Sequence, residues 1–140
     1  MACITPVGVT LEYGATDSGG TEVGSVVSIT PGAATVSTYD VTALADTTVQ
    51  KIASGRTDPG SMSFECYFND DTTAATSNLD DLEALLGEPA KYWLVKFNNA
   101  EASTYIGQGL VTSVEIGSIQ DDAIRFTITI EKTGTWAFTE

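Results

Sequence analysis

Residues 123–131 read AIRFTITIE, a segment in which apolar and polar side chains alternate. Successive side chains of a β-strand point to opposite faces of its sheet, so this alternation predicts a strand with one buried and one solvated face. The buried face is expected to carry Ile124, Phe126, Ile128 and Ile130. The solvated face is expected to carry Arg125, Thr127, Thr129 and Glu131.

Two other segments repeat this pattern. In 59–69, an apolar set alternates with a polar set: Met62, Phe64, Cys66 and Phe68 against Ser61, Ser63, Glu65 and Tyr67. In 104–116, one face is expected to carry Ile106, Leu110, Val114 and Ile116. Gly107 and Gly109 would lie on the opposite face, where glycine permits a bend or the close approach of another backbone.

The rest of the chain also favours β-structure. Less regular strands are expected at 7–13, 26–30, 35–42 and 91–97, which brings the total to about seven or eight, separated by turn residues. A length of 140 residues fits one domain, with 42% hydrophobic residues to form its core. We therefore predict a single, mainly β domain over 1–140, of the β-sandwich or barrel-like class.

One short helix is expected at about 77–86. Leu79, Leu82, Leu85 and Leu86 fall at helical spacing. Asp80 and Asp81 suit the first turn, where the helix dipole favours negative charge, and Ser77 or Asn78 suits the cap. Gly87 is a typical helix stop, so the helix is expected to end there and to lie across one sheet.

The segment 40–59 reads DVTALADTTVQKIASGRTDP and has no clear periodicity. It contains two of the six basic residues of the chain, Lys51 and Arg56. Long loops with little internal structure are uncommon inside compact domains and are often functional. We therefore predict a loop at about 40–58 that is either functional or disordered.

Composition argues against catalysis. The chain has no His, which removes His-based triads and His metal ligands, and two distant cysteines cannot form a Cys-rich zinc site. The adjacent carboxylates Asp70–Asp71, Asp80–Asp81 and Asp121–Asp122 all fall where Asp commonly caps turns or helices. We expect no enzyme activity, no cofactor and no metal site.

Nineteen acidic residues against six basic ones give a formal net charge of −13. Such a charge keeps copies of a protein apart in solution and disfavours binding to nucleic acid through phosphates. The sequence also lacks a run of about 18 apolar residues, so no membrane span is expected. Cys66, inside an alternating segment, is expected to be a small buried apolar residue rather than the partner of Cys3 in a disulfide.

Four aromatic residues leave a second function open. Trp93, Trp136, Tyr92 and Tyr105 could form a stacking platform for sugars, as in carbohydrate-binding β-sandwich modules. Trp93 shares a strand face with Val95 and Phe97, which favours a place in the core instead. Trp136, near the C-terminus, could take either role.

Residues 40–70 resemble a recurring stretch of the tail tube (major tail) proteins of long-tailed, siphovirus-type bacteriophages. In those proteins an Asp-Val-Thr-x-Leu-like stretch ends a strand, a loop follows, and Asp-Pro-Gly leads into a strand with alternating aromatic residues. The first part matches Asp40, Val41, Thr42 and Leu44. The second part matches Asp58, Pro59 and Gly60. The order of the other predicted elements agrees over nearly the whole chain.

The resemblance implies a tail tube fold with one flanking helix and without a C-terminal immunoglobulin-like domain. It implies hexameric rings that stack into a tube in the virion tail, assembled in the bacterial host cytoplasm. Partners would be further copies of the chain and other tail proteins, such as the tape measure, the tail terminator and the baseplate or tip. DNA would pass through an acidic lumen without specific binding.

Two sets of residues follow as candidate sites under this resemblance. The loop that joins subunits or rings would use Asp40, Val41, Thr42, Leu44, Asp46, Lys51, Arg56 and Asp58. The lumen would be lined by the polar strand faces, with Ser61, Ser63, Glu65, Thr127, Thr129 and Glu131 as candidates.

Overall fold

The computed structural model describes residues 7–24, 26–68, 76–77, 79–99, 102–117, 119 and 124–139. Several residues weighed above lie outside this range: Cys3, Asn69 to Asp71, Asn78 and the pair Asp121–Asp122. The side chain of Ser77 is not described either, so neither expected helix cap is tested.

The described chain is mainly β, as predicted, with one short helix. Its elements are β1 (Thr10–Thr16), β2 (Gly19–Val23), β3 (Val26–Thr30), β4 (Thr35–Asp40), β5 (Lys51–Asp58), β6 (Ser61–Tyr67), β7 (Thr76–Ser77), α1 (Leu79–Glu83), β8 (Lys91–Lys96), β9 (Thr104–Ile116) and β10 (Arg125–Thr139). The number of strands exceeds the expected seven or eight, because β2, β5 and β7 show no clear alternation in the sequence.

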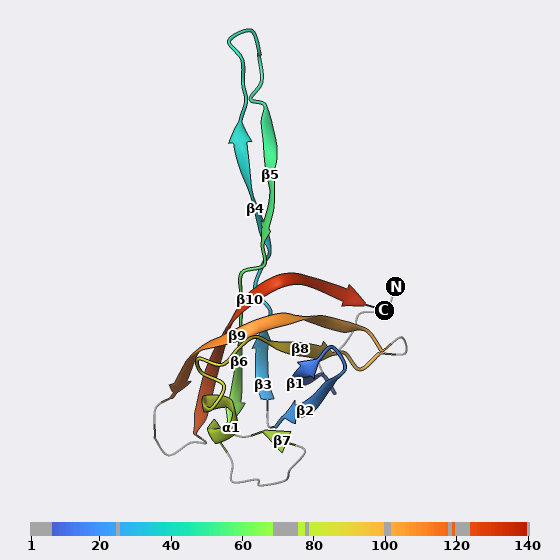
Figure 1. Cartoon of the computed structure of the whole chain (residues 1–140), viewed down its shortest axis with the longest axis vertical. Coiled ribbons are helices and arrows are strands. Elements are labelled where there is room, and N and C mark those ends of the chain that lie inside the picture. Colours follow the sequence, from blue (N-terminus) through green and yellow to red (C-terminus); the bar gives the residue numbers. More distant parts are fainter. Residues whose placement is uncertain are drawn as a thin grey trace.

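Eight strands form one sheet in the order β3-β6-β10-β9-β8-β1-β2-β7, antiparallel throughout except between β2 and β7. The other two strands, β4 and β5, pair only with each other. They project from the sheet as a long hairpin (Figure 1). We call residues 35–58 the arm and the remaining described residues the body.

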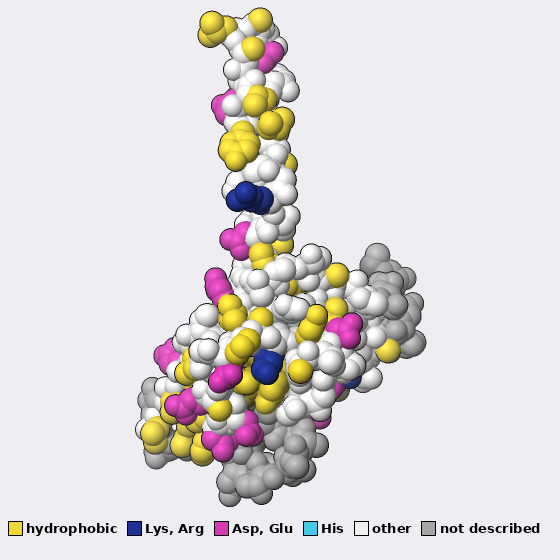
Figure 2. Space-filling model, in the orientation of Figure 1, with side chains coloured by type: hydrophobic (Ala, Val, Ile, Leu, Met, Phe, Trp, Pro, Cys, Tyr) yellow, Lys and Arg dark blue, Asp and Glu magenta, His cyan; other side chains and the backbone are white. Residues whose placement is uncertain are grey.

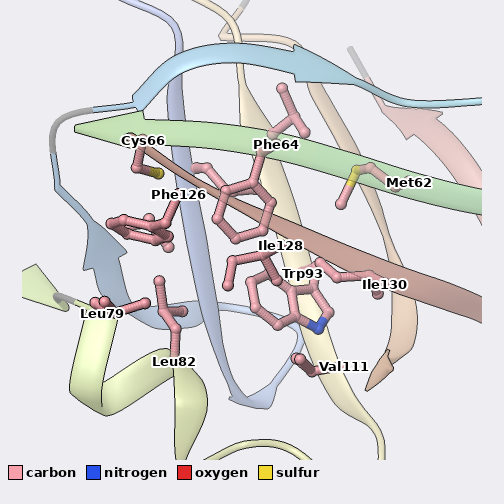
Figure 3. Close-up of a cluster of buried hydrophobic side chains, with 13 residues drawn as sticks. Met62, Phe64, Cys66, Leu79, Leu82, Trp93, Val111, Phe126, Ile128 and Ile130 are labelled. Carbon is pink, nitrogen blue, oxygen red and sulfur yellow. The ribbon is translucent and has the colours of Figure 1, made fainter. Parts of the chain in front are cut away.

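The body sheet closes on itself around a single core. Phe64 of β6 and Trp93 of β8 are separated by two strands in the sheet, yet their ring centroids lie 5.8 Å apart. The inner faces of the two halves of the sheet therefore pack against each other, as in a β-sandwich. Figure 3 shows this cluster, with Leu79 and Leu82 of α1 beside it.

The expected core of β6 and β10 is confirmed. The fully buried side chains include Met62, Phe64, Cys66, Phe126, Ile128 and Ile130. Each apolar side chain of this size stabilises the fold by about 1.5–3 kcal/mol when buried. Phe68, expected to face inward with them, is exposed instead because it follows the end of β6.

Cys66 behaves as the expected small apolar residue. Its thiol is free and buried. Burial, and secondly the charge of the neighbouring Glu65, raise the pKa of the Cys66 thiol to about 12. A thiol of this kind stays protonated and unreactive at neutral pH.

The face assignment predicted for β9 is wrong over its first half. The pairing with β10 shifts register between Thr129 and Ile130, so that Ser113 pairs with Thr129 but Val111 pairs with Ile130. This bulge reverses the alternation, so Val111 is buried and Leu110 is 38% exposed. A bulge inserts one residue and turns every side chain beyond it to the other face.

The two glycines of β9 permit a close approach, but of side chains and not of the other backbone that the sequence suggested. A methyl group on Gly107 would overlap the indole of Trp136, and one on Gly109 would overlap the side chain of Ile130. Both glycines lie on the core face of β9, next to Val111, because of the bulge. They make room for large side chains from β10.

Helix α1 is shorter than the predicted span of 77–86. After Glu83 the chain continues in tight turns, in which Leu85 N–H donates to Leu82 O and Leu86 N–H to Glu83 O. Gly87 then adopts the predicted left-handed conformation, with a φ of 78°, but the helix has already ended at Glu83 and not at this glycine. Leu79 and Leu82 are buried, whereas Leu86 is 41% exposed, because the helix ends before Leu86 can turn toward the core.

Candidate assembly surfaces

The segment predicted as a loop at 40–58 is in large part a strand. Residues 51–58 form β5, which pairs with β4 from Thr35↔Asp58 to Asp40↔Lys51. Only residues 41–50 connect the two strands, at the tip of the arm. Alternation did not reveal β5 because a ribbon exposed on both faces needs no apolar side.

Side chains of the predicted loop residues hold the tip together. Thr42 N–H donates to Asp40 Oδ1 at 2.9 Å, and Ala43 N–H donates to Asp46 Oδ2 at 2.7 Å. Gln50 N–H donates to the Thr42 hydroxyl at 2.9 Å, which joins the two sides of the tip. These bonds satisfy backbone groups that no strand partner reaches, so the tip has a defined shape.

The carboxylate of Asp40 is part of this arrangement. Hydrogen bonds from Thr42, first from its side chain and then from its backbone N–H, lower the pKa of Asp40 from its ordinary value of 3.8. The carboxylate of Asp58 also accepts a backbone hydrogen bond, at the base of the arm, where Gly60 N–H donates to Asp58 Oδ1 at 2.9 Å. The Asp-Pro-Gly of the sequence is thus the turn that leads from β5 into β6.

The arm exposes an unusual amount of apolar surface. The structure describes all of 35–58, and none of these residues is buried. Large exposed hydrophobic side chains run along its length (Figure 2): Val36, Tyr39, Val41, Leu44, Val49 and Ile52. Leu44 stands at the tip in full contact with solvent, and Tyr39 and Ile52 are direct cross-strand partners.

The two basic residues of the arm, Lys51 and Arg56, lie on β5 among these exposed apolar side chains. Lys51 is the cross-strand partner of Asp40, and Arg56 lies in a bulge with Ser54 and Gly55. Tyr39 and Arg56 line the same shallow hollow on one side of the arm. Isolated two-stranded hairpins are marginal in water, and contiguous exposed apolar surface commonly marks a binding site.

The six residues predicted to line a lumen lie together on one surface. In the register of β6 and β10, Glu65 pairs with Thr127, Ser63 with Thr129 and Ser61 with Glu131. Their side chains alternate with the buried ones and point away from the core. We call this surface of β3, β6, β10 and β9 the polar face.

Neighbouring strands enlarge the polar face beyond the sequence prediction. Glu115 and Ser113 of β9 pair with Thr127 and Thr129. On the other side, Ser28 and Thr30 of β3 pair with Glu65 and Ser63. Their place depends on sheet order, which alternation within one strand cannot show.

The polar face carries net negative charge. Glu65, Glu115 and Glu131 lie on it, and Arg125 at one end forms an ion pair with Glu65 at 3.1 Å. An exposed pair of this kind contributes little to stability. The surface therefore consists mainly of small hydroxyl side chains and carboxylates, with Tyr67, Arg125 and Leu110 at its margins.

The aromatic residues do not form an exposed platform. Trp93 is fully buried, as the sequence favoured. Trp136, left open by the sequence, is partly buried, with its ring against Gly107 and its Nε1–H donating to Gln108 O at 2.8 Å. Tyr105 packs on Trp136 with 5.1 Å between the ring centroids, so its ring faces protein.

The described residues contain no group of three or more Cys, Asp or Glu side chains placed to hold a metal ion. In the same part of the chain, no helix is long and apolar enough to cross a membrane. Asp80 and Asp81 occupy the first turn of α1, as expected of residues that stabilise a helix start.

Comparison with known proteins gives structural matches only. The sequence matches no family profile and no curated protein. The fold is similar to a chain in the tail of an empty gene transfer agent particle with C6 symmetry, at 15% identity and a TM-score of 0.69, covering 99% of this chain and 100% of that one.

Two more solved structures share the fold. A chain of the native gene transfer agent virion has 14% identity and a TM-score of 0.62, covering 99% of this chain and all of that one. A chain of the six-fold symmetrised anti-feeding prophage baseplate has 9% identity and a TM-score of 0.65, covering 94% and 90%. The predicted fold, that of tail proteins in phage-like particles, is confirmed.

Proposed function

We propose that this chain is a structural subunit of a phage-like tail, and that it forms stacked hexameric rings in which the arm joins neighbouring copies. The observation that carries the proposal is the arm itself, a hairpin with six exposed large hydrophobic side chains and no core of its own. Packing against another copy would cover this surface. The match to chains of particles described with six-fold symmetry supports the ring size.

The symmetry of such an assembly fits the shape of the chain. The arm and the surface that receives it are different parts of the molecule, so the contact is head-to-tail, and a head-to-tail contact that closes by rotation forms a ring. Stacked rings would then bring each arm near a further ring. Other tail proteins would bind at the two ends of the tube, where one ring face lacks a neighbour.

We assign the polar face to the lumen of the tube. Its hydroxyl groups and carboxylates present no cationic cluster to phosphates, which lie at about one charge per 1.7 Å along duplex DNA. A wall of this kind would let DNA pass without adhering. The proposed role is mechanical and requires no catalytic group, cofactor or metal.

Electron microscopy of the purified protein tests the assembly. We expect rings or tubes in negative stain, at concentrations where the arm contacts form. A matched variant removes residues 36–57 and joins Thr35 to Asp58 through Asn-Gly, because these two residues are cross-strand partners at the base of the arm. This variant should fold and remain monomeric.

Two outcomes would count against the proposal. Wild-type protein that stays monomeric across concentration and salt would remove the assembly. If the variant without the arm forms tubes, the chain is still a tail subunit, but the contact between copies is made by the body and not by the arm.

Charge reversal tests the assignment of the lumen separately. Glu65→Lys with Glu131→Lys places cations on the polar face, and tubes of this variant should retain DNA that wild-type tubes release. The matched control makes the same change in charge at two exposed carboxylates outside the polar face, as Glu83→Lys with Glu88→Lys at the end of α1 and just after it. Equal DNA retention by both variants would contradict the assignment.

A further inference from the structure

The two legs of the arm meet at its base in a close backbone contact. Residues 31–34 lead into β4, and Pro59–Gly60 lead out of β5. Gly32 and Gly60 have φ values of 76° and 79°. A methyl group on Gly32 would overlap Ser61 O, and one on Gly60 would overlap Ala33 O, so the legs touch without side chains between them.

Lys132 of β10 binds both legs. Its backbone N–H donates to Gly60 O at 2.9 Å, on the outgoing leg. Its ammonium donates to Pro31 O at 2.6 Å, on the incoming leg. One residue of the body therefore holds the chain on both sides of the arm.

The ammonium of Lys132 is itself held on its other sides. It donates to the Tyr105 hydroxyl at 3.0 Å, and it lies 5.3 Å from the ring centroid of Tyr105 and 5.2 Å from that of Trp136. Attraction between a cation and an aromatic face strengthens when both are shielded from water. Trp136 is fixed in turn by its bond to Gln108 and its contact with Gly107.

The burial of Lys132 calls for an explanation. The residue is only 6% exposed, and among the described residues it forms no ion pair with a carboxylate. Lysine is rarely so buried, because removing its charge from water is costly. An apolar residue would pack between Tyr105 and Trp136 without that cost but could not reach Pro31 O with a donor.

We propose that Lys132 is a positioning residue that sets the direction in which the arm leaves the body. Its ammonium fixes the incoming leg and its backbone N–H fixes the outgoing leg, while Tyr105 and Trp136 prevent the ammonium from moving. The inference concerns the single subunit and does not depend on the proposed tail function.

Distance measurements by pulsed electron paramagnetic resonance test this role. Nitroxide labels at Val49→Cys near the tip and Glu115→Cys on the body, in a Cys3→Ser background, report the direction of the arm. Cys66 is buried and should not take a label. Dilution with excess unlabelled protein restricts the signal to distances within one subunit.

We expect a narrow distance distribution in the wild type and a broadened or shifted one in Lys132→Met, which keeps the aliphatic stem and removes the ammonium. Lys96→Met is the matched control, because Lys96 pairs with Glu12 on the body and is far from the arm in the sheet order. The control should keep the wild-type distribution. An unchanged distribution in folded Lys132→Met overturns the proposal.

A second variant serves if Lys132→Met does not fold. Tyr105→Phe keeps the ammonium and the aromatic ring but removes one hydrogen-bond acceptor of Lys132. The distribution should broaden relative to the wild type, and a width equal to that of the wild type would overturn the proposal. Circular dichroism of each labelled variant verifies that the body is folded.

Discussion

The body and the arm are built from the same kind of antiparallel strand pair, yet they differ in what covers them. Ile128 in β10 is fully buried by side chains from several strands, whereas Ile52 in β5 is 54% exposed beside its partner Tyr39. The body buries a core of its own within one chain, although some of its large apolar side chains, such as Ile116 and Phe138, are also exposed. The arm has no core of its own, and under the proposed function this separates folding from assembly in the same molecule.

The largest effect is expected in the body. Phe64→Ala removes a fully buried ring from the centre of the core and should lower the free energy of unfolding by about 3–5 kcal/mol. Ile52→Ala on the arm should change it by less than about 0.5 kcal/mol. Urea denaturation measures both, and similar losses for the two variants would remove the distinction between body and arm.

The next effect concerns association. Tyr39 and Ile52 are cross-strand partners on the arm, and both side chains are exposed. Tyr39→Ala and Ile52→Ala each remove most of one of these two side chains. If the pair is an interface hot spot worth about 2 kcal/mol, the concentration needed for polymerisation should rise about 30-fold. Light scattering against protein concentration measures this threshold, and Ile116→Ala on the body is a control with the same residue type and similar exposure to Ile52 that should leave the threshold unchanged.

Substitution of one glycine in the body and one in the arm tests the same difference between the two regions, with smaller expected effects. Gly107→Ala drives a methyl group into Trp136 and should lower the free energy of unfolding by about 1–3 kcal/mol. Gly55→Ala meets no atom within 4 Å, but its φ of 83° is unfavourable for alanine. We expect Gly55→Ala to accelerate amide hydrogen exchange in the arm only. A loss of global stability in Gly55→Ala would show that the arm and body unfold together.

The smallest effect is the titration of Asp40. Hydrogen bonds from Thr42 lower the pKa of Asp40 in the folded arm. The ionised carboxylate therefore stabilises the ordered tip at every pH above the pKa that Asp40 has in the unfolded chain. This stabilisation is lost as the pH falls through the lowered pKa. Nuclear magnetic resonance should give a midpoint for Asp40 below 3.8, together with faster exchange of the Thr42 amide at low pH. A midpoint at or above 3.8 would contradict the bond.

The sequence predicts best the parts of the molecule that bury one face. Alternation located β6 and the first half of β10, and Gly87 marked the end of the helical turn region. Alternation failed at β9 and β5. In β9 a bulge turns Val111 into the core in place of the predicted Leu110, and β5 has no buried face that would produce an alternating pattern.

The candidate sites show the same division. Alternation predicted that Ser63 and Glu65 on one strand, and Thr129 on another, point away from the core, because a period of two needs only local sequence. That the two strands are neighbours depends on sheet order. The role of Lys132 could not be predicted, since it depends on the distant residues Pro31, Gly60 and Tyr105. In the sequence it is simply a charged residue after a strand with a regular pattern.

The base of the arm has a mechanical consequence because the arm is a lever. About ten residues separate Thr35 from the tip, so at a strand rise of about 3.3 Å per residue the lever is about 33 Å long, and a rotation of about 10° at its base moves the tip by about 6 Å. Leu44 would then miss a contact made at van der Waals distance. Under the proposed assembly, the accuracy with which an arm reaches a neighbouring subunit would be set at the short end of the lever, by a few hydrogen bonds on Lys132.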